Sequence, residues 1–493
     1  KGPIFDTMIS HYLIQPELKH DFAFVAHSIL KYQVISKEDK SKGKKAQLSL
    51  MLEPEVIEHE SYCEETVLNL ELKEEFEGRM KDNELLDLFY NIEMPLVSVL
   101  ADMEFTGVSI DVQTLKEYAL VLNEEVDGIE KEIKEMAEVD FNVASPKQLG
   151  DVLFDKMELD SKAKRTKSGQ YSTSEDVLSK LKEKHEIIQK ILDFRSLKKL
   201  ISTYVEALPT YINEKSGKIH TSFNQAEAAT GRLSSTNPNL QNIPIRTEQG
   251  RYIRKAFVPS SENHTFLSAD YSQVELRLMA HMSQDQNMID AFINSEDFHT
   301  ATAAKIYKLP LEEVSKDMRS RAKTANFGII YGVSVFGFSN QTDLNRTEAK
   351  ELIDTYYATY PKLRNFISEQ VDFARDNGYV QTVLGRRRYL KDINSRNAVV
   401  RGAAERNAVN APIQGSAADI IKIAMINIHN KLNDGNYKTK MLLQVHDELV
   451  FDVYKPELEA IKKLVKTEME NAYKLEVPLD VDLDIGDNWL EAH

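Results

Sequence analysis

Two aspartates, Asp270 and Asp447, each follow an apolar run and lie in a polar context that suits metal chemistry. Asp270 follows Phe266-Leu267-Ser268-Ala269, and Asp447 follows Leu442-Leu443-Gln444-Val445-His446. Carboxylates from distant segments can together hold two divalent cations about 4 Å apart, which clamp the attacking and leaving oxygens of an in-line phosphoryl displacement. The pair therefore predicts a metal-dependent site for nucleotidyl transfer.

A helix predicted between the two aspartates carries cations and aromatic residues on one side. Residues four positions apart stay on one face of a helix at about 100° per residue, and here they are Arg319, Lys323, Phe327 and Tyr331. Two cations one turn apart suit a triphosphate, with Arg319 on the outer phosphate and Lys323 on the leaving pyrophosphate. Phe327 would then pack on the sugar and base, and Tyr331-Gly332 would close the pocket. The alternative is an ordinary amphipathic helix with solvated charges.

The segment His446-Asp447-Glu448 lies between two apolar runs, so we expect it at the tip of a β-hairpin. Neighbours on a continuous strand point to opposite faces, whereas a turn lets Asp447 point at the metals with Glu448 nearby. For such a triplet alone, a solvated turn is the competing interpretation. Pairing with Asp270 favours the metal site.

Two serines have the spacing of a capping box, in which a serine side chain and a glutamate three residues later bind each other's backbone N–H groups. Ser272 precedes Glu275 in this way, and Ser172 precedes Glu175. We therefore expect one helix to begin at Ser272 and another at Ser172.

A later helix carries a second set of residues with a four-residue spacing: Arg406, Asn410 and Gln414. Asparagine and glutamine offer hydrogen-bond donors without net charge. Such donors suit the minor-groove acceptors that every base pair presents. This spacing predicts a contact with base pairs that tolerates any sequence.

The length and composition place broad limits on the protein. A chain of 493 residues is too long for one core, so we expect about two to four domains or subdomains. It contains no apolar run long enough to predict a transmembrane helix. The start, Lys1-Gly2-Pro3-Ile4-Phe5-Asp6, lacks the regions of a signal peptide, and we interpret it as a cut inside a domain. The single cysteine, Cys63, excludes an intramolecular disulfide and suits a reducing cytoplasm.

The net charge of −16 argues at face value against nucleic acid, because phosphate contacts normally come from basic surfaces. Local charge nevertheless decides what a groove binds. Glutamates concentrate in residues 53–78 and 124–138, whereas basic residues cluster at Lys162, Lys164, Arg165 and Lys167 and again at Arg386, Arg387 and Arg388. Each such run also fits a merely solvated surface.

The apolar pattern predicts a sheet that is interrupted by helices. Strand-like runs occur at residues 218–224, 265–270, 441–445 and 449–453, and a helical block from about 274 to 375 separates the second run from the third. Two long charged helices, at about 112–138 and 174–213, flank the polar stretch 161–174. We expect these two helices to form a hairpin.

Three further segments complete a recognisable pattern: Thr230-Gly231-Arg232-Leu233-Ser234-Ser235, Leu240-Gln241-Asn242-Ile243-Pro244 and Gly486-Asp487-Asn488-Trp489. Together with the two aspartate segments and the cationic helix, these segments occur in the order found in family A DNA polymerases. From about residue 90 to the end, the chain resembles the polymerase core of this family, to which the bacterial DNA polymerase I enzymes belong.

The resemblance implies a helix-rich α+β protein with the right-hand polymerase fold, in which the palm holds an antiparallel sheet and the fingers and thumb are helical. It assigns the thumb to residues 91–215 and the fingers to 276–400. The palm would comprise residues 216–275 and 401–493. Residues 1–90 would be a partial 3′–5′ exonuclease-like segment.

The exonuclease-like segment lacks most of the residues that its chemistry needs. Phe5-Asp6-Thr7-Met8 resembles the stretch that holds one metal-binding aspartate of the family, whereas the family's earlier Asp-x-Glu pair is absent. Ser61 and Glu65 stand where the family has tyrosine and aspartate. One remaining carboxylate cannot build a two-metal hydrolytic site, so we predict that the segment is inactive.

The resemblance also implies roles for individual residues. Two Mg²⁺ ions, which Mn²⁺ can replace, would bind at Asp270, Tyr271 and Asp447, with Glu448 and Lys323 as further catalytic groups. Glu275 would exclude a 2′-hydroxyl, beside or instead of its capping role. Nucleotide contacts are implied for Arg319, Lys323, Phe327, Tyr331, Gly332, Gln273, Glu275 and His299. DNA contacts are implied for Arg232, Arg246, Arg254, Arg406, Asn410, Gln414 and His446, although Arg232, Arg246 and Arg254 would also fit plain surface arginines.

The function implied is that of a template-directed DNA polymerase, which adds deoxynucleoside triphosphates to a primer 3′-OH in DNA replication and repair. We expect a monomer in the cytoplasm, at the nucleoid, with primer-template DNA as partner and no membrane. One alternative is a single-subunit RNA polymerase-like enzyme, against which Glu275, Phe327 and Thr230-Gly231-Arg232 argue. The other is a catalytically silent DNA-binding relative, against which the intact carboxylates and phosphate-binding side chains argue.

Overall fold

A computed structural model describes residues 4–35, 54–245, 247–294 and 297–493. The chain divides into two compact units, each built from three segments. Unit 1 comprises Lys1–Phe105, Phe223–Thr236 and Ala269–Leu483, and unit 2 comprises Thr106–Ser222, Asn237–Ser268 and Asp484–His493. Arg246, one of the predicted DNA contacts, lies outside the described residues. None of the described helices is both long and apolar enough to cross a membrane.

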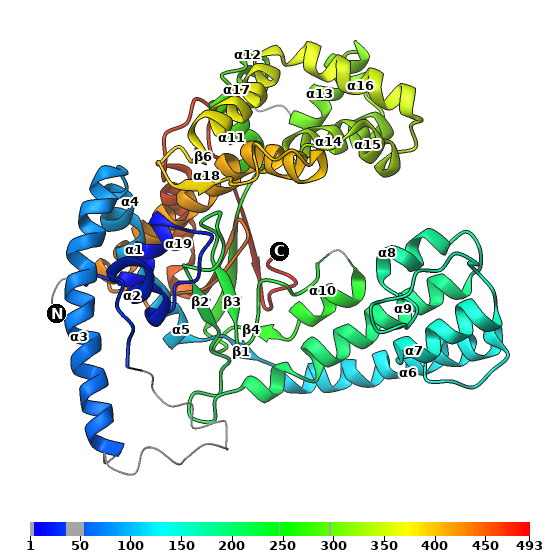
Figure 1. The fold of residues 1–493 in the computed structure, drawn as a ribbon, viewed down its shortest axis with the longest axis horizontal. Helices are drawn as coiled ribbons and strands as arrows, with labels where there is room; N and C mark the ends of the chain where they lie inside the picture. Colours follow the sequence, from blue (N-terminus) through cyan, green and yellow to red (C-terminus); the bar gives the residue numbers. More distant parts are fainter. Residues whose placement is uncertain (1–3, 36–53, 246, 295–296) are drawn as a thin grey trace. The chain divides into compact units, whose positions relative to one another are not determined.

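Unit 1 begins with a group of packed helices. Helices α1 (Thr7–Ile14) and α2 (Phe22–Leu30) lie against α3 (Pro54–Asp82), and α5 (Met94–Thr106) follows a π-helical turn, η1 (Phe89–Glu93) (Figure 1). Asp6, the predicted remnant of a metal site, is the N-cap of α1, where its carboxylate accepts a hydrogen bond from Ile9 N at 2.9 Å. The structure thus gives Asp6 a role in helix capping.

The predicted helical block is confirmed. It contains seven α-helices among the described residues: α11 (Val274–Ser283), α12 (Gln286–Ile293), α13 (Phe298–Tyr307), α14 (Lys316–Ile330), α15 (Val335–Gln341), α16 (Arg346–Thr359) and α17 (Pro361–Asn377). Asn345 begins α16 with a complete capping box to Glu348. Helices α13 and α14 pack against each other and bury Ala322, Ala325 and Ile329 (Figure 1).

A four-stranded sheet with the order β10-β5-β9-β8 carries the predicted aspartates. Its strands are β5 (His264–Tyr271), β8 (Lys440–Val445), β9 (Glu448–Tyr454) and β10 (Val481–Gly486). Three of them confirm predicted runs. The fourth, β10, was not predicted, although its alternating apolar and acidic residues are typical of a strand at the edge of a sheet. Of the predicted run 218–224, only β2 (Ser222–Asn224) forms a strand, and it pairs with β3 (Ser234–Thr236).

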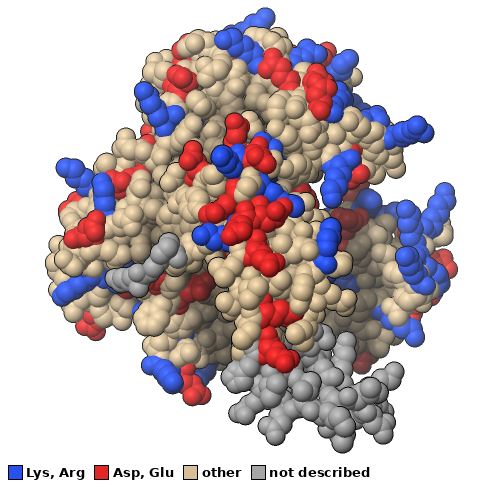
Figure 2. Space-filling model, turned by 60° about the vertical axis from the view of Figure 1, so that its left-hand side comes forward, with Lys and Arg blue, Asp and Glu red and all other residues tan. Residues whose placement is uncertain are grey.

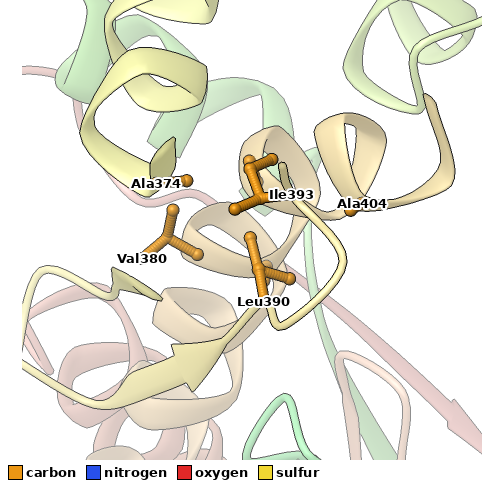
Figure 3. Packing of buried hydrophobic residues seen from close by; sticks show 7 residues of the cluster. Ala374, Val380, Leu390, Ile393 and Ala404 are labelled. Carbon is orange, nitrogen blue, oxygen red and sulfur yellow. The ribbon is translucent and has the colours of Figure 1, made fainter. Parts of the chain in front are cut away.

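A β-hairpin packs against the longest helix of unit 1. The hairpin consists of β6 (Tyr379–Gln381) and β7 (Arg387–Tyr389), and the helix is α18 (Ala398–Asp434), which continues through Pro412. Apolar side chains from α17, β6, the segment that follows β7 and α18 form a buried cluster (Figure 3) that consists of Ala374, Val380, Leu390, Ile393, Ala404, Ala408 and Ala411. This packing fixes the hairpin on α18.

Unit 2 is built around α6 (Val112–Ala137), which confirms the first predicted charged helix and packs against α9 (Ile187–Leu200) (Figure 1). The second predicted helix, 174–213, is wrong as a single element. The structure breaks it into α8 (Glu175–Leu178), α9 and three short 3₁₀ or π turns. The polar stretch at 182–186 offers no apolar face to bury, and Pro209 cannot continue a helix.

The predicted capping box at Ser172 is also wrong. Ser174 is the N-cap of α8, and its side chain makes no capping hydrogen bond. Ser172 instead donates its backbone N–H to Lys164 O at 2.9 Å, beside an antiparallel bridge between Arg165 and Tyr171. The segment is therefore extended, and the three-residue spacing has no structural role there.

Candidate active site

The end of β5 and the turn between β8 and β9 bring the two predicted aspartates to neighbouring positions. The backbone N–H of Tyr271 donates to the carbonyl oxygen of Asp447 at 3.2 Å, and Asp270 directly precedes Tyr271. The predicted hairpin tip is confirmed, because β8 ends at Val445 and β9 begins at Glu448. Four residues of the predicted site, Asp270, Tyr271, Asp447 and Glu448, are thus gathered at one end of the sheet.

The surroundings of Asp447 favour binding of a cation. Burial raises the pKa of Asp447, and the nearby charge of Glu275 raises it further, whereas His446 and Arg232 lower it. Glu448, the next residue, is 2% exposed. A divalent ion would offset the cost of keeping these carboxylates charged in a partly buried place.

The carboxylates of this site fit the way in which Mg²⁺ is coordinated in nucleotide-binding enzymes. Within the described residues, no group of three or more His, Cys, Asp or Glu side chains is already arranged to hold a metal ion. Mg²⁺ commonly binds one or two carboxylates and completes its coordination with water and substrate phosphates. Asp270 and Asp447 at adjacent strand ends suit that mode.

Glu275 accepts hydrogen bonds from two distant residues. Arg232 Nη2 donates to its Oε1 at 2.7 Å, and the Tyr331 hydroxyl donates to its Oε2, also at 2.7 Å. The predicted capping box at Ser272 is therefore wrong. Helix α11 begins after Gln273, which has a left-handed backbone with φ of 55°, and Ser272 donates its N–H to Asp480 O at 2.9 Å. Ser272 lies in the turn between β5 and α11 and does not cap the helix.

The predicted cationic stripe lies on α14. Arg319, Lys323 and Phe327 are within the helix, and Tyr331 is its C-cap. Arg319 is paired with Asp297, whose Oδ2 accepts from Nη2 at 2.6 Å and from Nε at 3.1 Å. Sequence reasoning missed Asp297 as a partner, because an aspartate that begins a helix normally has only a capping role. Asp297 does cap α13 as well, accepting from Thr300 N at 2.8 Å.

His299, a predicted nucleotide contact, lies behind the stripe. Its ring is 5.7 Å from that of Phe327, and its Nδ1 is 2.9 Å from Asn326 Nδ2. Burial lowers the pKa of His299 to about 4, Asp297 opposes this shift, and Arg319 and Lys323 add to it. The imidazole is therefore neutral at pH 7, and its Nδ1 can accept from Asn326.

A pocket of about 600 Å³ opens beside the stripe. Its lining includes five of the predicted nucleotide and DNA contacts, Lys323, Phe327, Tyr331, Gly332 and Arg406. Gly332 has φ of 66°, and a Cβ atom added there would lie 2.6 Å from Arg406 Cγ. Only glycine allows this close approach of the α14 end to α18. The volume is in the range of small-molecule sites.

Two predicted contacts present polar atoms without a partner. Among the described residues, Asn410 Oδ1 and Gln273 Oε1 are buried and have no hydrogen-bond partner. Buried polar atoms are normally paired, so these two amides are candidates for ligand contacts. Asn410 lies on α18 between Arg406, which is exposed, and Gln414, which is partly buried. His446, at the hairpin tip, is exposed.

The structure shows that two groups of basic residues are less exposed than surface arginines would be. Arg254 is 3% exposed, and its guanidinium lies 4.1 Å from the ring centre of Trp489, so it is not a plain surface arginine, and its contact with DNA stays a prediction. The run Arg386-Arg387-Arg388 is not a basic surface. Arg386 is buried among carboxylates, Arg387 donates to Asn83 Oδ1, and Arg388 faces Glu17.

Comparison with known proteins supports these observations. The family model described as DNA polymerase family A matches residues 112–491. DNA polymerase I of Geobacillus stearothermophilus is 45% identical over 493 residues, which is 100% of this chain and 56% of the relative. DNA polymerase I of Streptococcus pneumoniae TIGR4 is 46% identical over 494 residues, with the same coverage of 100% and 56%. The chain thus spans about half the length of the curated relatives it matches.

A solved structure is similar over nearly the whole chain. It is described as the POL domain of Pol1 from M. smegmatis in complex with DNA primer-template and dNTP. It is 39% identical, covers 99% of this chain and 82% of the other, and has a TM-score of 0.88. With this similarity, the interrupted sheet and the helical block identify the right-hand fold of the family A polymerases. The chain belongs to DNA polymerase family A.

Proposed function

We propose that this chain is a template-directed DNA polymerase that adds deoxynucleoside triphosphates to a primer 3′-OH and releases pyrophosphate. The observation that carries the proposal is the hydrogen bond from Tyr271 N to Asp447 O, which brings Asp270 and Asp447, the proposed metal ligands, to neighbouring positions. Family membership supports it, as does the primer-template DNA and dNTP that the M. smegmatis relative holds. We further propose roles in DNA replication and repair.

Two Mg²⁺ ions are proposed at Asp270, Tyr271 and Asp447, with Mn²⁺ as a substitute. When bound, they would raise the acidity of the primer 3′-hydroxyl and stabilise charge on the α-phosphate and on pyrophosphate. Glu448 is proposed to support Asp447 from the start of β9, where it is buried. The protein's part is to hold these carboxylates in place.

The nucleotide is proposed to bind in the pocket beside α14. Lys323 lines this pocket and would neutralise the leaving pyrophosphate, while Arg319, one turn earlier, would bind the outer phosphate. Phe327 would contact the sugar and base, and Tyr331 and Gly332 would close the pocket. His299 and Gln273 are proposed as further nucleotide contacts.

Glu275 is proposed to select the deoxyribose sugar. With both carboxylate oxygens accepting hydrogen bonds, from Arg232 and Tyr331, its side chain cannot turn away to admit an additional hydroxyl without losing one of them. A site rejects one extra oxygen strongly only through a clash or an unpaired polar group. This fixed carboxylate would supply the clash.

Primer-template DNA is proposed to lie against α18 and the hairpin tip. Arg406, Asn410 and Gln414 would contact base pairs, and His446 and Arg232 would lie near the primer end. The net charge of −16 limits the electrostatic part of binding. On the face drawn in Figure 2, basic side chains are set among acidic ones, which gather in a central patch. We therefore do not expect tight binding that persists at high salt.

The division into parts is proposed as follows: a thumb at residues 91–215, a palm at 216–275 and 401–493, fingers at 276–400, and an exonuclease-like segment at 1–90. We propose that the last segment has no 3′–5′ exonuclease activity, because Asp6 caps α1 and because Ser61 and Glu65 stand where the family has tyrosine and aspartate. Degradation of a labelled 3′ end with Mg²⁺, lost in Asp6→Ala, would contradict this. A cytoplasmic monomer at the nucleoid is also proposed.

The test is primer extension on a defined template with Mg²⁺, in which each of the four deoxynucleotides is omitted in turn. We expect the product to stop at each position where the template calls for the missing nucleotide. A parallel series with ribonucleotides tests the sugar. Preference for ribonucleotides would favour an RNA polymerase-like enzyme, and no extension at all would favour a silent DNA-binding relative.

A further inference from the structure

Four charged side chains are buried together in unit 1, and none of them has a role in the proposed reaction. We call them the buried ion cluster: Glu93 at the end of η1, Arg386 just before β7, and Asp419 and Lys422 on α18. Their side chains are at most 4% exposed. Two positive and two negative charges balance each other, which is the condition for burying charge without a large penalty.

The guanidinium of Arg386 is held by two carboxylates. Its Nε and Nη2 donate to Asp419 Oδ1 at 2.9 and 2.7 Å, and Nη2 also donates to Glu93. Lys422 Nζ donates to the same Glu93 oxygen at 2.7 Å. Thr382 in turn donates to Asp419 Oδ2 at 2.8 Å. The plane of the guanidinium is therefore fixed by carboxylates from two separate elements, η1 and α18.

The turn that precedes Arg232 lies directly on this guanidinium. Gly231 has φ of 85°, and a Cβ atom added there would lie 2.6 Å from Arg386 Nε and 2.8 Å from its Cδ. The turn is closed by a bond from Gly231 N to Ala228 O at 3.0 Å. Tyr12 anchors the same carbonyl, its hydroxyl donating at 2.6 Å.

The other side of the turn touches α18. A Cβ atom added at Gly415 would lie 3.0 Å from the carbonyl oxygen of Thr230. The Thr230-Gly231 backbone is thus confined between α18 and Arg386, and the next residue is Arg232. Arg232 reaches Glu275 through a single 2.7 Å hydrogen bond, which a small shift of the turn would break.

We propose that Arg386 is a positioning residue, whose guanidinium, locked by Asp419 and Glu93, sets the turn at Gly231 and so directs Arg232 onto Glu275. This inference rests on the proposed function, because Glu275 is taken there to select the sugar. It assigns the buried ion cluster a part in sugar selectivity, although no member of it is proposed to contact the nucleotide.

Arginine is needed at this position for its shape as well as for its charge. A lysine would keep the positive charge beside Glu93 and Asp419, but it lacks the planar fork that binds both carboxylates and supports Gly231. The hairpin itself would remain in place. Val380 and Leu390 pack in the apolar cluster of Figure 3, and Thr382 N still donates to the backbone carbonyl of residue 386.

The test is a double-mutant cycle read through sugar selectivity. Purified native protein, Arg386→Lys, Arg232→Ala and the double variant are compared in primer extension, and the efficiency ratio of deoxy- to ribonucleotide incorporation is measured for each. This ratio does not depend on the fraction of active protein, so a general loss of folding does not move it. Arg388→Lys is the matched control, because Arg388 lies two residues away and its nearest carboxylate oxygen, on Glu17, is 4.0 Å from Nε.

We expect Arg386→Lys to lower the ratio about tenfold in the native background and less than about twofold when Arg232 is already alanine, the pattern of residues that act through one another. The control should leave the ratio unchanged. An unchanged ratio in Arg386→Lys, or the same loss with and without Arg232, would overturn the inference.

A second variant covers the case in which Arg386→Lys does not fold. Asp419→Asn retains a side-chain oxygen for Arg386 while it removes the charge that orients the guanidinium. Loss of selectivity that depends on Arg232 supports the inference, and unchanged selectivity or an independent loss overturns it. If the native protein itself does not extend a primer, the proposed function fails and this inference with it. An active native protein without the coupling refutes the positioning role alone.

Discussion

Tyr331 donates its hydroxyl proton to Glu275 Oε2 at 2.7 Å, across 56 positions of sequence. Burial raises the pKa of Tyr331, and the bond to Glu275 raises it further, so the hydroxyl keeps its proton at neutral pH. The other oxygen of Glu275 accepts from Arg232. The carboxylate that we propose as the sugar selector is therefore held by donors from two different segments.

Removing the Tyr331 hydroxyl should loosen this selector. In Tyr331→Phe the ring still lines the pocket, but one oxygen of Glu275 loses its donor. We expect extension with deoxynucleotides to persist, and the preference for deoxy- over ribonucleotides to fall about three- to tenfold, the equivalent of one lost hydrogen bond. Tyr90→Phe is the control, because Tyr90 also donates to a glutamate, Glu77 at 2.5 Å, outside the site. Equal loss in both variants would contradict the role of Tyr331.

The two aspartates should be needed for chemistry and not for DNA binding. Asp270→Ala or Asp447→Ala is expected to lower extension by at least about a thousandfold, because a metal pair contributes several kcal/mol to transition-state stabilisation. Primer-template affinity, measured by fluorescence anisotropy, should change less than about threefold. Asp482→Ala, an exposed aspartate of β10, is the control. Extension at the native rate by either site variant would refute the metal assignment.

The parts of the site that depend on local sequence were predictable. Asp447 was placed in a turn because apolar runs flank it, and the structure has β8 and β9 on either side. The stripe of Arg319, Lys323 and Phe327 follows from helical spacing, and α14 contains all three. In both cases the signal lies within a few residues, so periodicity alone carries it.

The partners of these residues were not predictable, because each comes from far along the chain. The spacing of Ser272 and Glu275 indicated a capping box, whereas the real donors to Glu275 are 43 and 56 residues away. Arg386 belonged to a run that looked like a basic surface, yet it is neutralised by Glu93, 293 residues earlier. No periodicity encodes such a pairing. It follows from the tertiary fold.

The pairing of Arg319 with Asp297 gives a prediction for nucleotide affinity. Asp297→Asn keeps a capping side chain for α13 but removes a negative charge that occupies Arg319. Without this charge, Arg319 loses its ion-pair partner, and the site repels a triphosphate less. We therefore expect the KM for deoxynucleotides to fall about two- to fivefold with kcat little changed, which is the scale of an exposed ion pair. Asp343→Asn is the control, since Asp343 pairs with Arg321 on the same helix at 2.6 Å. A raised KM for Asp297→Asn would contradict this.

His299 should make the stability of unit 1 depend on pH. Burial lowers its pKa from 6.5 to about 4, so between these values the unfolded chain binds a proton that the folded chain does not. Stability then rises with pH through this window and is fully present above about pH 6.5. Protonation would also remove the acceptor that Asn326 uses at 2.9 Å.

Replacing His299 should flatten that dependence. We expect the free energy of unfolding of native protein to fall between pH 7 and pH 5 by about 2 kcal/mol more than that of His299→Gln. Urea denaturation of both proteins at several pH values between 4.5 and 7.5 measures the difference, and the acidic groups common to both cancel in the comparison. Parallel curves for the two proteins would show that His299 does not titrate in this range. A steeper curve for the variant would reverse the sign of the effect and contradict the burial argument.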